Sequence, residues 1–248
     1  MAYIERLVIN DTTKADILYD EHIVRYRFVA PYVKNKQVLD IACGSGYGAA
    51  ILAKAGARVI GIDLDLEALT EAEKNYGSSV SFKQGDAAQI PLEDSSIDIA
   101  TSFETIEHIG NYEDFVKELQ RVVSNEGIVF ISTPNKTVFG QKNPFHVKEF
   151  TKEEFSTLLK KYFSHVHILE QKNGIASVIA GDGVSALSIN DTESEALYFM
   201  AVCSKSEIVT QFGSAASINM AALERRDNNP AWKAINVLYK ILQKLHII

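Results

Sequence analysis

Short apolar runs alternate with amphipathic stretches between about residues 37 and 134. The runs predict buried strands at 37–43, 57–63, 80–86, 96–103 and 127–133. Between them, apolar residues recur at helical spacing over 48–56, 64–77 and 111–127, and the first two of these stretches close at a glycine. Strands that alternate with helices at this spacing predict a parallel sheet with helices on both faces.

The pattern changes after Pro134. Residues 135–149 have little periodicity, and a loop of this length inside a compact domain is usually functional. Thr151 and Glu154 then form a capping-box pattern that predicts a helix over 151–163. Two further strands are expected at 165–173 and 195–205, separated by a polar, glycine-bearing insertion at 174–194. Their closeness in sequence predicts an antiparallel finish to the sheet.

Helical additions are predicted at both ends of the chain. Residues 19–33 have the pattern of an amphipathic helix, and another helix is expected to start at Pro230. We therefore divide the chain into an N-terminal lid at 1–36, a central domain at 37–205 and a C-terminal extension at 206–248. The apolar stripe of the extension is expected to pack on the domain or on a second copy in a homodimer; a membrane-surface or partner helix is the alternative.

Composition narrows the class of protein. The 248 residues are 46% hydrophobic and 23% charged, which is ordinary for a soluble globular chain. The net charge of −7 disfavours binding to duplex nucleic acid, although a single-stranded RNA end stays open as a target. The two cysteines predict no disulfide framework. Since the start is too polar for a signal peptide and no apolar run reaches roughly 18 residues, we predict a cytoplasmic protein without a membrane span.

A glycine-rich motif, "VLDIACGSGYGA", lies where the first predicted strand turns into a helix. Gly44, Gly46 and Gly48 let the backbone bend tightly and let a ligand approach it. This spacing also fits a dinucleotide fingerprint. Asp63 ends the second strand, where the ribose hydroxyls of either type of cofactor would meet a carboxylate. The motif alone therefore leaves the cofactor undecided.

Further features argue against a dinucleotide. Asp40 lies inside the motif, where it can pair with a cationic amino group but would repel a pyrophosphate. Asp86 ends the third strand, where a carboxylate can accept a hydrogen bond from an adenine amino group. Together with the antiparallel finish of the sheet, these features decide against a dinucleotide.

With these residues in place, the chain resembles class I S-adenosylmethionine-dependent methyltransferases of the type found in bacterial glycan and natural-product gene sets. The matching pieces are Asp40 to Gly46, Asp63, Gly85 to Ala87, "IDIATSFETIEHI" and "GIVFISTPN". The resemblance covers about residues 20 to 205. It implies a Rossmann-like, doubly wound α/β sheet of seven strands in the order 3-2-1-4-5-7-6, with the seventh strand antiparallel.

The resemblance also implies roles for individual residues. The cofactor would lie at the carboxyl ends of strands one to four. The methionine part would contact Asp40, Ala42 and Gly44, and the ribose and adenine would contact Asp63, Leu64, Asp86 and Ala87. Gly46 would also belong to the cofactor site. Phe103 would line the pocket, and Arg25 or Tyr26 of the N-terminal helix would reach the methionine carboxylate.

The stretch "SFETIEHIG" follows the fourth strand. On a helical turn, Glu104, Glu107 and His108 would share one face, and His146 lies in the loop after the fifth strand. Such an O,O,N,N set suits Mg²⁺, Mn²⁺ or Zn²⁺. The pattern resembles small-RNA 3′-end methyltransferases, where these residues hold a divalent metal, and its first part resembles quinone O-methyltransferases. Alternatively, His108 or His146 is a metal-free general base, assisted by Glu107, or the residues only line or support the pocket.

The whole pattern predicts methyl transfer from S-adenosylmethionine to a hydroxyl of a sugar, glycan or related small molecule. A His or a divalent metal would activate the acceptor oxygen. Methylation of carbon or nitrogen on a lipid, quinone or other natural product is the main alternative. A nicotinamide-dependent oxidoreductase and a non-catalytic, methyltransferase-like partner protein are the alternatives from other classes.

Overall fold

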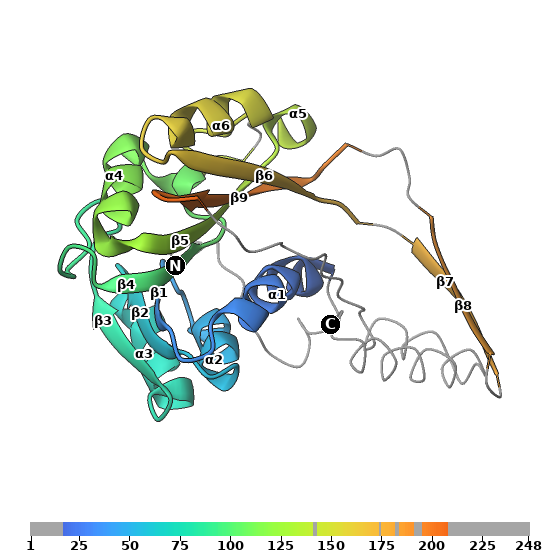
Figure 1. The fold of residues 1–248 in the computed structure, drawn as a ribbon, viewed down its shortest axis with the longest axis horizontal. Coiled ribbons are helices and arrows are strands. Elements are labelled where there is room, and N and C mark those ends of the chain that lie inside the picture. The colour runs from blue at the N-terminus through green and yellow to red at the C-terminus, as the bar shows by residue number, and fades with distance from the viewer. Residues whose placement is uncertain (1–16, 141–142, 174, 182–183, 191–194, 208–248) are drawn as a thin grey trace. The chain divides into compact units, whose positions relative to one another are not determined.

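The computed structural model describes residues 17–140, 143–173, 175–181, 184–190 and 195–207. Seven strands form one sheet in the order β3-β2-β1-β4-β5-β9-β6 (Figure 1). β9 is antiparallel to both of its neighbours, β5 and β6. The predicted order and the antiparallel seventh strand are therefore confirmed. The bounds are β1 Gln37–Ile41, β2 Arg58–Asp63, β3 Val80–Gln84, β4 Ile97–Ser102, β5 Val123–Pro134, β6 His165–Gln171 and β9 Tyr198–Ser204.

The strand order decides where the helices lie. From β1 the chain steps outward through α2 (Tyr47–Lys54), β2 and α3 (Leu66–Tyr76) to β3, whereas α4 (Tyr112–Val122) carries it from β4 in the opposite direction to β5. Because such crossovers are right-handed, α2 and α3 cover one face of the sheet and α4 covers the other (Figure 1). The direction reverses between β1 and β4, and ligands of open α/β sheets bind beside the carboxyl ends of the strands at such a point.

The main apolar core lies between the sheet and the helices α4 and α6 (Lys152–Lys160). Phe115, Val116 and Leu119 of α4 are fully buried, as their helical spacing predicts. The predicted capping box at the start of α6 is present: the Thr151 hydroxyl accepts from the Glu154 N–H at 3.2 Å, and the Glu154 carboxylate accepts from the Thr151 N–H at 2.9 Å.

The structure differs from the prediction at the end of one helix and inside the insertion. The helix predicted over 111–127 ends at Val122, because Val123 already pairs with Ile97 of β4 and begins β5. Two adjacent β-branched residues and the following Gly127 favour this early change to extended backbone. The insertion at 174–194 contains a two-stranded antiparallel hairpin, β7 (Ile175–Gly181) with β8 (Val184–Asn190). Apolar residues dominate both strands, but neither strand keeps a strict apolar–polar alternation, so the insertion gave no clear strand signal.

The described residues fall into two compact units. Residues 29–171 and 195–207 form the first, which contains the seven-stranded sheet. Residues 17–28 belong to the second with the β7–β8 hairpin, and they form most of α1 (Ile17–Val29). The short helices η2 (Ala30–Tyr32), η3 (Ile106–His108) and α5 (Lys136–Phe139) lie in the first unit. The predicted C-terminal helix lies outside the described residues, so the division at 36/37 and 205/206 stays a prediction.

Within the described part of the chain, no helix combines the length and the apolar character needed to cross a membrane.

Candidate functional site

Asp63 joins the carboxyl ends of three neighbouring strands. Its Oδ2 accepts a hydrogen bond from the Gly44 N–H at 2.7 Å, and its Oδ1 accepts from the Asp65 N–H at 2.9 Å. Its backbone carbonyl accepts from the Gly85 N–H at 3.0 Å. The predicted ribose ligand thus also fixes the glycine loop after β1 to the ends of β2 and β3.

The glycine loop has two different steric requirements. Gly44 and Gly46 both have positive φ, at +54° and +80°. A Cβ at Gly46 would lie 2.7 Å from the Phe82 ring and 2.9 Å from the Ala72 Cβ, so Gly46 is required for packing. A Cβ at Gly44 would meet nothing within 4 Å. Gly44 therefore borders open space, which is where a cofactor can approach the backbone.

Ala42 and Glu104 share an unusual backbone conformation near the carboxyl ends of β1 and β4. Their φ angles are +58° and +52°, in the left-handed region that L-residues disfavour. Strain of this kind concentrates at binding and catalytic sites. Both residues were predicted as site residues, and those roles stay predictions.

Behind the loop lies a buried carboxylate. Asp40 is fully buried, and the Thr101 hydroxyl donates to its Oδ1 at 2.7 Å. Phe103, which follows β4, is also buried. Burial, and then the negative charges of Asp40 and Asp63, raise the pKa of the Cys43 thiol far above its usual range. Cys43 therefore stays protonated and is no nucleophile.

The predicted adenine side of the site is open. Asp86 is exposed, and its Oδ1 accepts from the Ala88 N–H at 2.8 Å, while Ala87 packs against the core. Leu64 is 66% exposed although it directly follows β2. An exposed leucine beside the strand ends offers an apolar surface for a flat ring such as adenine.

Two side chains of α4, which sequence reasoning missed, form hydrogen bonds to the backbone after Asp86. The Arg121 guanidinium of α4 donates to the carbonyls of Ile90 and Leu92, each at 2.8 Å. The Glu118 carboxylate accepts from the Ile90 N–H at 2.8 Å and from the Arg121 guanidinium at 2.7 Å. Only the i, i+3 spacing of Glu118 and Arg121 was visible in the sequence, and this spacing is common on exposed helices.

The stretch after β4 folds differently from the prediction. The short helix η3 begins at Ile106, and Glu104 lies before it with a left-handed backbone. Glu104 therefore does not share a helical face with Glu107 and His108, and the prediction of a common face is wrong. Instead, the Ser132 hydroxyl of β5 donates to the Glu104 carboxylate at 2.7 Å and accepts from the Glu104 N–H at 3.1 Å.

Three of the four predicted metal ligands do converge. Glu107, His108 and His146 each place one ligand atom within 4.8 Å of the others, and Glu104 lies outside this group. Glu107 is fully buried. The two imidazole rings meet edge to face, with 4.9 Å between their centroids. Below, these three residues are called the Glu-His-His cluster.

The backbone fastens the loop that carries His146 to η3. The N–H groups of Val147 and Lys148 both donate to the Glu107 carbonyl, at 2.7 and 3.1 Å. The Nδ1 of His108 lies 3.1 Å from the carbonyl oxygen of Phe145. The loop after β5 and the turn after β4 therefore form one unit, which holds the Glu-His-His cluster together.

Two neighbours of His146 were not predicted. Its Nδ1 lies 2.8 Å from Oε1 of Glu149, and its Nε2 lies 3.1 Å from Nδ2 of Asn143. Glu149 is fully buried. The spacing His-x-x-Glu was the available signal in the sequence, but the loop was expected to be irregular, so no spacing argument applied to it.

The family comparison agrees with this geometry. Residues 39–131 match the family model described as a methyltransferase domain. This stretch of the chain is therefore similar to a methyltransferase domain. The matched segment runs from β1 to β5 and includes the glycine loop, Asp63, Asp86, Glu107 and His108.

Individual relatives are similar to this chain over 146 and 108 residues. A "Probable S-adenosylmethionine-dependent methyltransferase" of Mycobacterium tuberculosis is 35% identical over 146 residues, which are 57% of this chain and 53% of the relative. A ubiquinone biosynthesis O-methyltransferase of Colwellia psychrerythraea is 32% identical over 108 residues, 42% of this chain and 44% of the relative. The chain thus spans about half the length of the curated relatives that it matches.

Solved structures support the fold. A SAM-dependent methyltransferase from Thermotoga maritima superposes with a TM-score of 0.56 at 17% identity, over 76% of this chain and 90% of the other. At this identity the likeness shows the Rossmann-like methyltransferase fold alone.

Arg25 and Tyr26 lie on α1, in the second unit. Their predicted contact with the methionine carboxylate stays a prediction.

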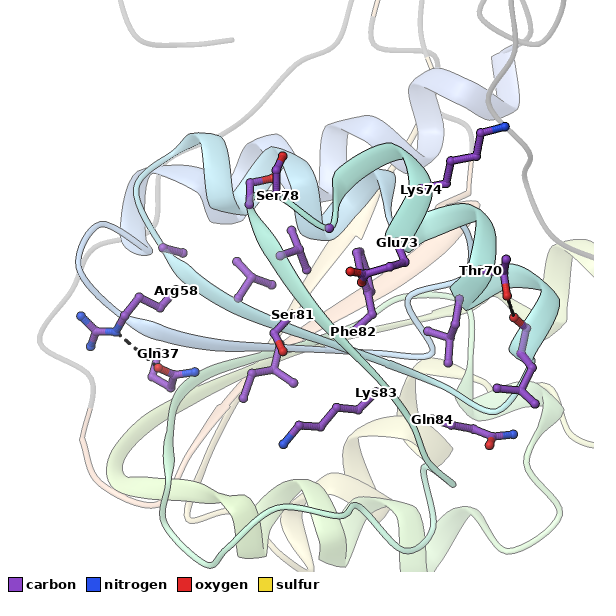
Figure 2. Close-up of a pocket in the computed structure, with 18 residues that line it drawn as sticks. Gln37, Arg58, Thr70, Glu73, Lys74, Ser78, Ser81, Phe82, Lys83 and Gln84 are labelled. Carbon is purple, nitrogen blue, oxygen red and sulfur yellow. Dashed lines mark hydrogen bonds between the residues drawn. The ribbon is translucent and has the colours of Figure 1, made fainter.

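The first unit also has an open hollow of about 1010 Å³ against β2, β3 and α3. Figure 2 shows its labelled side chains, among them Arg58, Lys83 and Gln84, spread along the strand and helix without converging on one point. No residue predicted for the cofactor or for catalysis lines it.

Proposed function

We propose that the chain is an S-adenosylmethionine-dependent methyltransferase that methylates a hydroxyl group of a sugar, glycan or related small molecule. The observation that carries the proposal is the joint arrangement of two features in the first unit. One is the glycine loop, which Asp63 fixes and which borders open space at Gly44. The other is the Glu-His-His cluster beside the end of β4.

The residues around the glycine loop suit the parts of the cofactor. Asp63 would accept from the ribose hydroxyls, and Asp86 with Ala87 would meet the adenine. Leu64, which is largely exposed, would cover one face of the adenine ring. Asp40 would attract the cationic amino end, and Phe103 would line the pocket. When bound, S-adenosylmethionine supplies an electrophilic methyl group.

The chain's own residues would orient and deprotonate the acceptor. In a direct displacement, the acceptor oxygen forms a bond to the methyl carbon while the carbon–sulfur bond breaks, and the hydroxyl proton must leave. An imidazole nitrogen of His108 or His146 that has a lone pair can take that proton as a general base. Glu107, which is fully buried beside them, would stabilise the positive charge that the imidazole gains.

The Glu-His-His cluster also fits a divalent metal. One carboxylate and two imidazoles are ligands that Zn²⁺, Mn²⁺ and related ions accept, and their ligand atoms lie within 4.8 Å of one another. A bound metal would lower the pKa of an acceptor hydroxyl. Glu107, His108 and His146 would hold it, with Glu104 outside the set.

A quinone-type or lipid acceptor is the second candidate. Phe145 and Val147, on either side of His146, are 42% and 58% exposed, and these apolar side chains favour an acceptor with an apolar body. The similarity to ubiquinone biosynthesis O-methyltransferases points the same way.

The test is methyl transfer to a small panel of acceptors. The full chain is incubated with S-adenosylmethionine and either methyl glycosides or catechols, and S-adenosylhomocysteine and the methylated product are measured by mass spectrometry. We expect turnover that His146→Ala abolishes and that His165→Ala, on exposed β6, leaves unchanged. Turnover on catechols alone would favour the second candidate, and His146→Ala retaining full activity would contradict the proposed role of the cluster.

A further inference from the structure

Glu149 is a buried charge that the proposed function does not use. Its side chain has no exposed surface, and His146, three residues earlier, is 9% exposed. Burying a carboxylate is strongly unfavourable unless a partner compensates it. The carboxylate Oε1 lies 2.8 Å from His146 Nδ1.

The hydrogen bonds around His146 determine which of its nitrogens carries the proton. The backbone N–H of Phe145 can only donate, and it lies 3.0 Å from Asn143 Oδ1. This contact fixes the orientation of the Asn143 amide, so its NH₂ group faces His146 Nε2 at 3.1 Å. Because an amide NH₂ donates, His146 Nε2 must accept and therefore carries a lone pair.

The proton of the neutral ring must then lie on Nδ1, which donates a hydrogen bond to Glu149 Oε1. In a doubly protonated ring, the Nε2–H would face the Asn143 NH₂, so two donors would meet. The same holds for the Nε2–H tautomer. We infer that Glu149 is a positioning residue, which holds His146 in the Nδ1–H tautomer and so keeps a lone pair on Nε2. Asn143 reinforces this tautomer from the other side of the ring.

His108 is held in the same tautomer by a different partner. Its Nδ1 lies 3.1 Å from the Phe145 carbonyl, which can only accept, so Nδ1 donates and Nε2 keeps its lone pair. The short segment 143–149 thus fixes both imidazoles of the Glu-His-His cluster. It does so with one backbone carbonyl and one buried carboxylate.

The functional meaning of this tautomer rests on the proposed function. An imidazole can accept a proton from an acceptor hydroxyl, or bind a metal, only through a nitrogen that has a lone pair. In either role, the hydroxyl or the cation takes the place of the Asn143 NH₂ at Nε2. Carboxylate partners of this kind orient the ring and raise the basicity of its far nitrogen.

The experiment is a long-range ¹H–¹⁵N correlation spectrum of the full chain, labelled with ¹⁵N-histidine, at mildly alkaline pH without cofactor. His146→Gln assigns the resonance. In the wild type we expect His146 to have its proton on Nδ1. In Glu149→Ala we expect the ratio of the two tautomers to shift several-fold toward Nε2–H. Glu149→Gln retains an amide oxygen that can accept, so it should largely restore the wild-type pattern.

The matched control is Glu153→Gln, on the exposed first turn of α6, which should leave His146 and His108 unchanged. A wild-type His146 with its proton on Nε2 would overturn the inference, whatever the variants do. An unchanged tautomer ratio in folded Glu149→Ala would overturn it as well. Because no cofactor or acceptor is used, a failure of S-adenosylhomocysteine to bind would contradict the proposed function and leave this result unaffected.

Discussion

The Asp63 carboxylate accepts a hydrogen bond from the Gly44 N–H at 2.7 Å, across nineteen residues of sequence. The contact joins the end of β2 to the loop after β1. The residue that is predicted to bind the ribose therefore also shapes the loop that would receive the methionine part. Binding of the cofactor and order of the loop depend on the same carboxylate.

Asp63→Ala removes both contributions. We expect the affinity for S-adenosylhomocysteine to fall more than tenfold, and the free energy of unfolding to fall by about 1–3 kcal/mol, because two half-buried donors lose a charged acceptor. Calorimetry and urea unfolding measure the two effects.

Asp65→Ala is the matched control. Asp65 caps α3, where its carboxylate accepts from the N–H groups of Glu67 and Ala68. Loss of the cap should cost about 1 kcal/mol of stability and leave the affinity for S-adenosylhomocysteine unchanged. Equal losses of affinity in the two variants would contradict a specific role for Asp63.

Gly44→Ala and Gly46→Ala should separate binding from packing. A Cβ at Gly44 enters open space, so that variant should lose affinity for S-adenosylhomocysteine and only about 1–2 kcal/mol of stability from backbone strain. A Cβ at Gly46 meets the Phe82 ring at 2.7 Å, so that variant should lose about 2–5 kcal/mol. Thermal unfolding of both variants checks the ranking, and the reverse ranking would show that the loop is misassigned.

Ala42→Gly should stabilise the protein. Ala42 has a φ of +58°, which costs an L-residue about 1–2 kcal/mol, and glycine adopts this angle freely. After the extra entropy of the unfolded chain is subtracted, we expect a gain of about 0.5–1 kcal/mol. Ala50→Gly, inside α2, is the opposite control and should lose about 1 kcal/mol. Urea unfolding decides, and a loss of stability in Ala42→Gly would contradict the strained conformation.

Much of the fold and part of the candidate site could be predicted from the sequence. The alternation of strands and helices, together with the family resemblance, predicts the sheet order. Residues that follow a strand, such as Asp63, are then placed without further information, since strand ends meet at one edge. His146 is placed near Glu107 because each follows one of two adjacent parallel strands.

Predictions from local spacing fail where contacts between residues distant in sequence determine the backbone conformation. The i, i+3, i+4 argument assumed that a helix includes Glu104, but Glu104 is left-handed and bonds to Ser132 on β5. Arg121 contacts Ile90 and Leu92 across about thirty residues of chain, which no periodicity reveals. The network at Asn143 and Glu149 depends on the path of an irregular loop.

Glu118 gives a prediction on pH. The hydrogen bond from Arg121 lowers the pKa of the Glu118 carboxyl below its usual range, and the Ile90 N–H contributes as well. Because the folded-state pKa is lowered, the ionised carboxylate stabilises the fold above the unfolded pKa of about 4.3, and this stability is lost as the pH falls through the folded-state value. Glu118→Gln should therefore cost about 1–3 kcal/mol at neutral pH and progressively less in acid.

Urea unfolding at several pH values measures this dependence. Glu126→Gln, at an exposed position early in β5, is the control and should change little at any pH. A difference between wild type and Glu118→Gln that persists undiminished in strong acid would contradict the stabilising role of the carboxylate.

The geometry of the Glu-His-His cluster predicts that substitutions of Glu107 and Glu104 affect metal binding differently. If Mn²⁺ binds the protein, Glu107→Gln and His146→Ala should weaken its binding more than tenfold, because each removes a ligand from the group. Glu104→Gln should leave Mn²⁺ binding nearly unchanged, because Glu104 lies outside the group and bonds to Ser132. Titrations followed by electron paramagnetic resonance measure free Mn²⁺ directly. Equal effects of both glutamate variants would restore the four-ligand set.

The most direct test of the central claim is calorimetric titration of S-adenosylhomocysteine into the full chain, with and without EDTA treatment, beside Gly44→Ala. The structure predicts binding of one ligand per chain, which survives EDTA and is lost or strongly weakened in Gly44→Ala while that variant stays folded. No binding to the wild type under either condition would contradict the assignment of the glycine loop and Asp63 as the cofactor site.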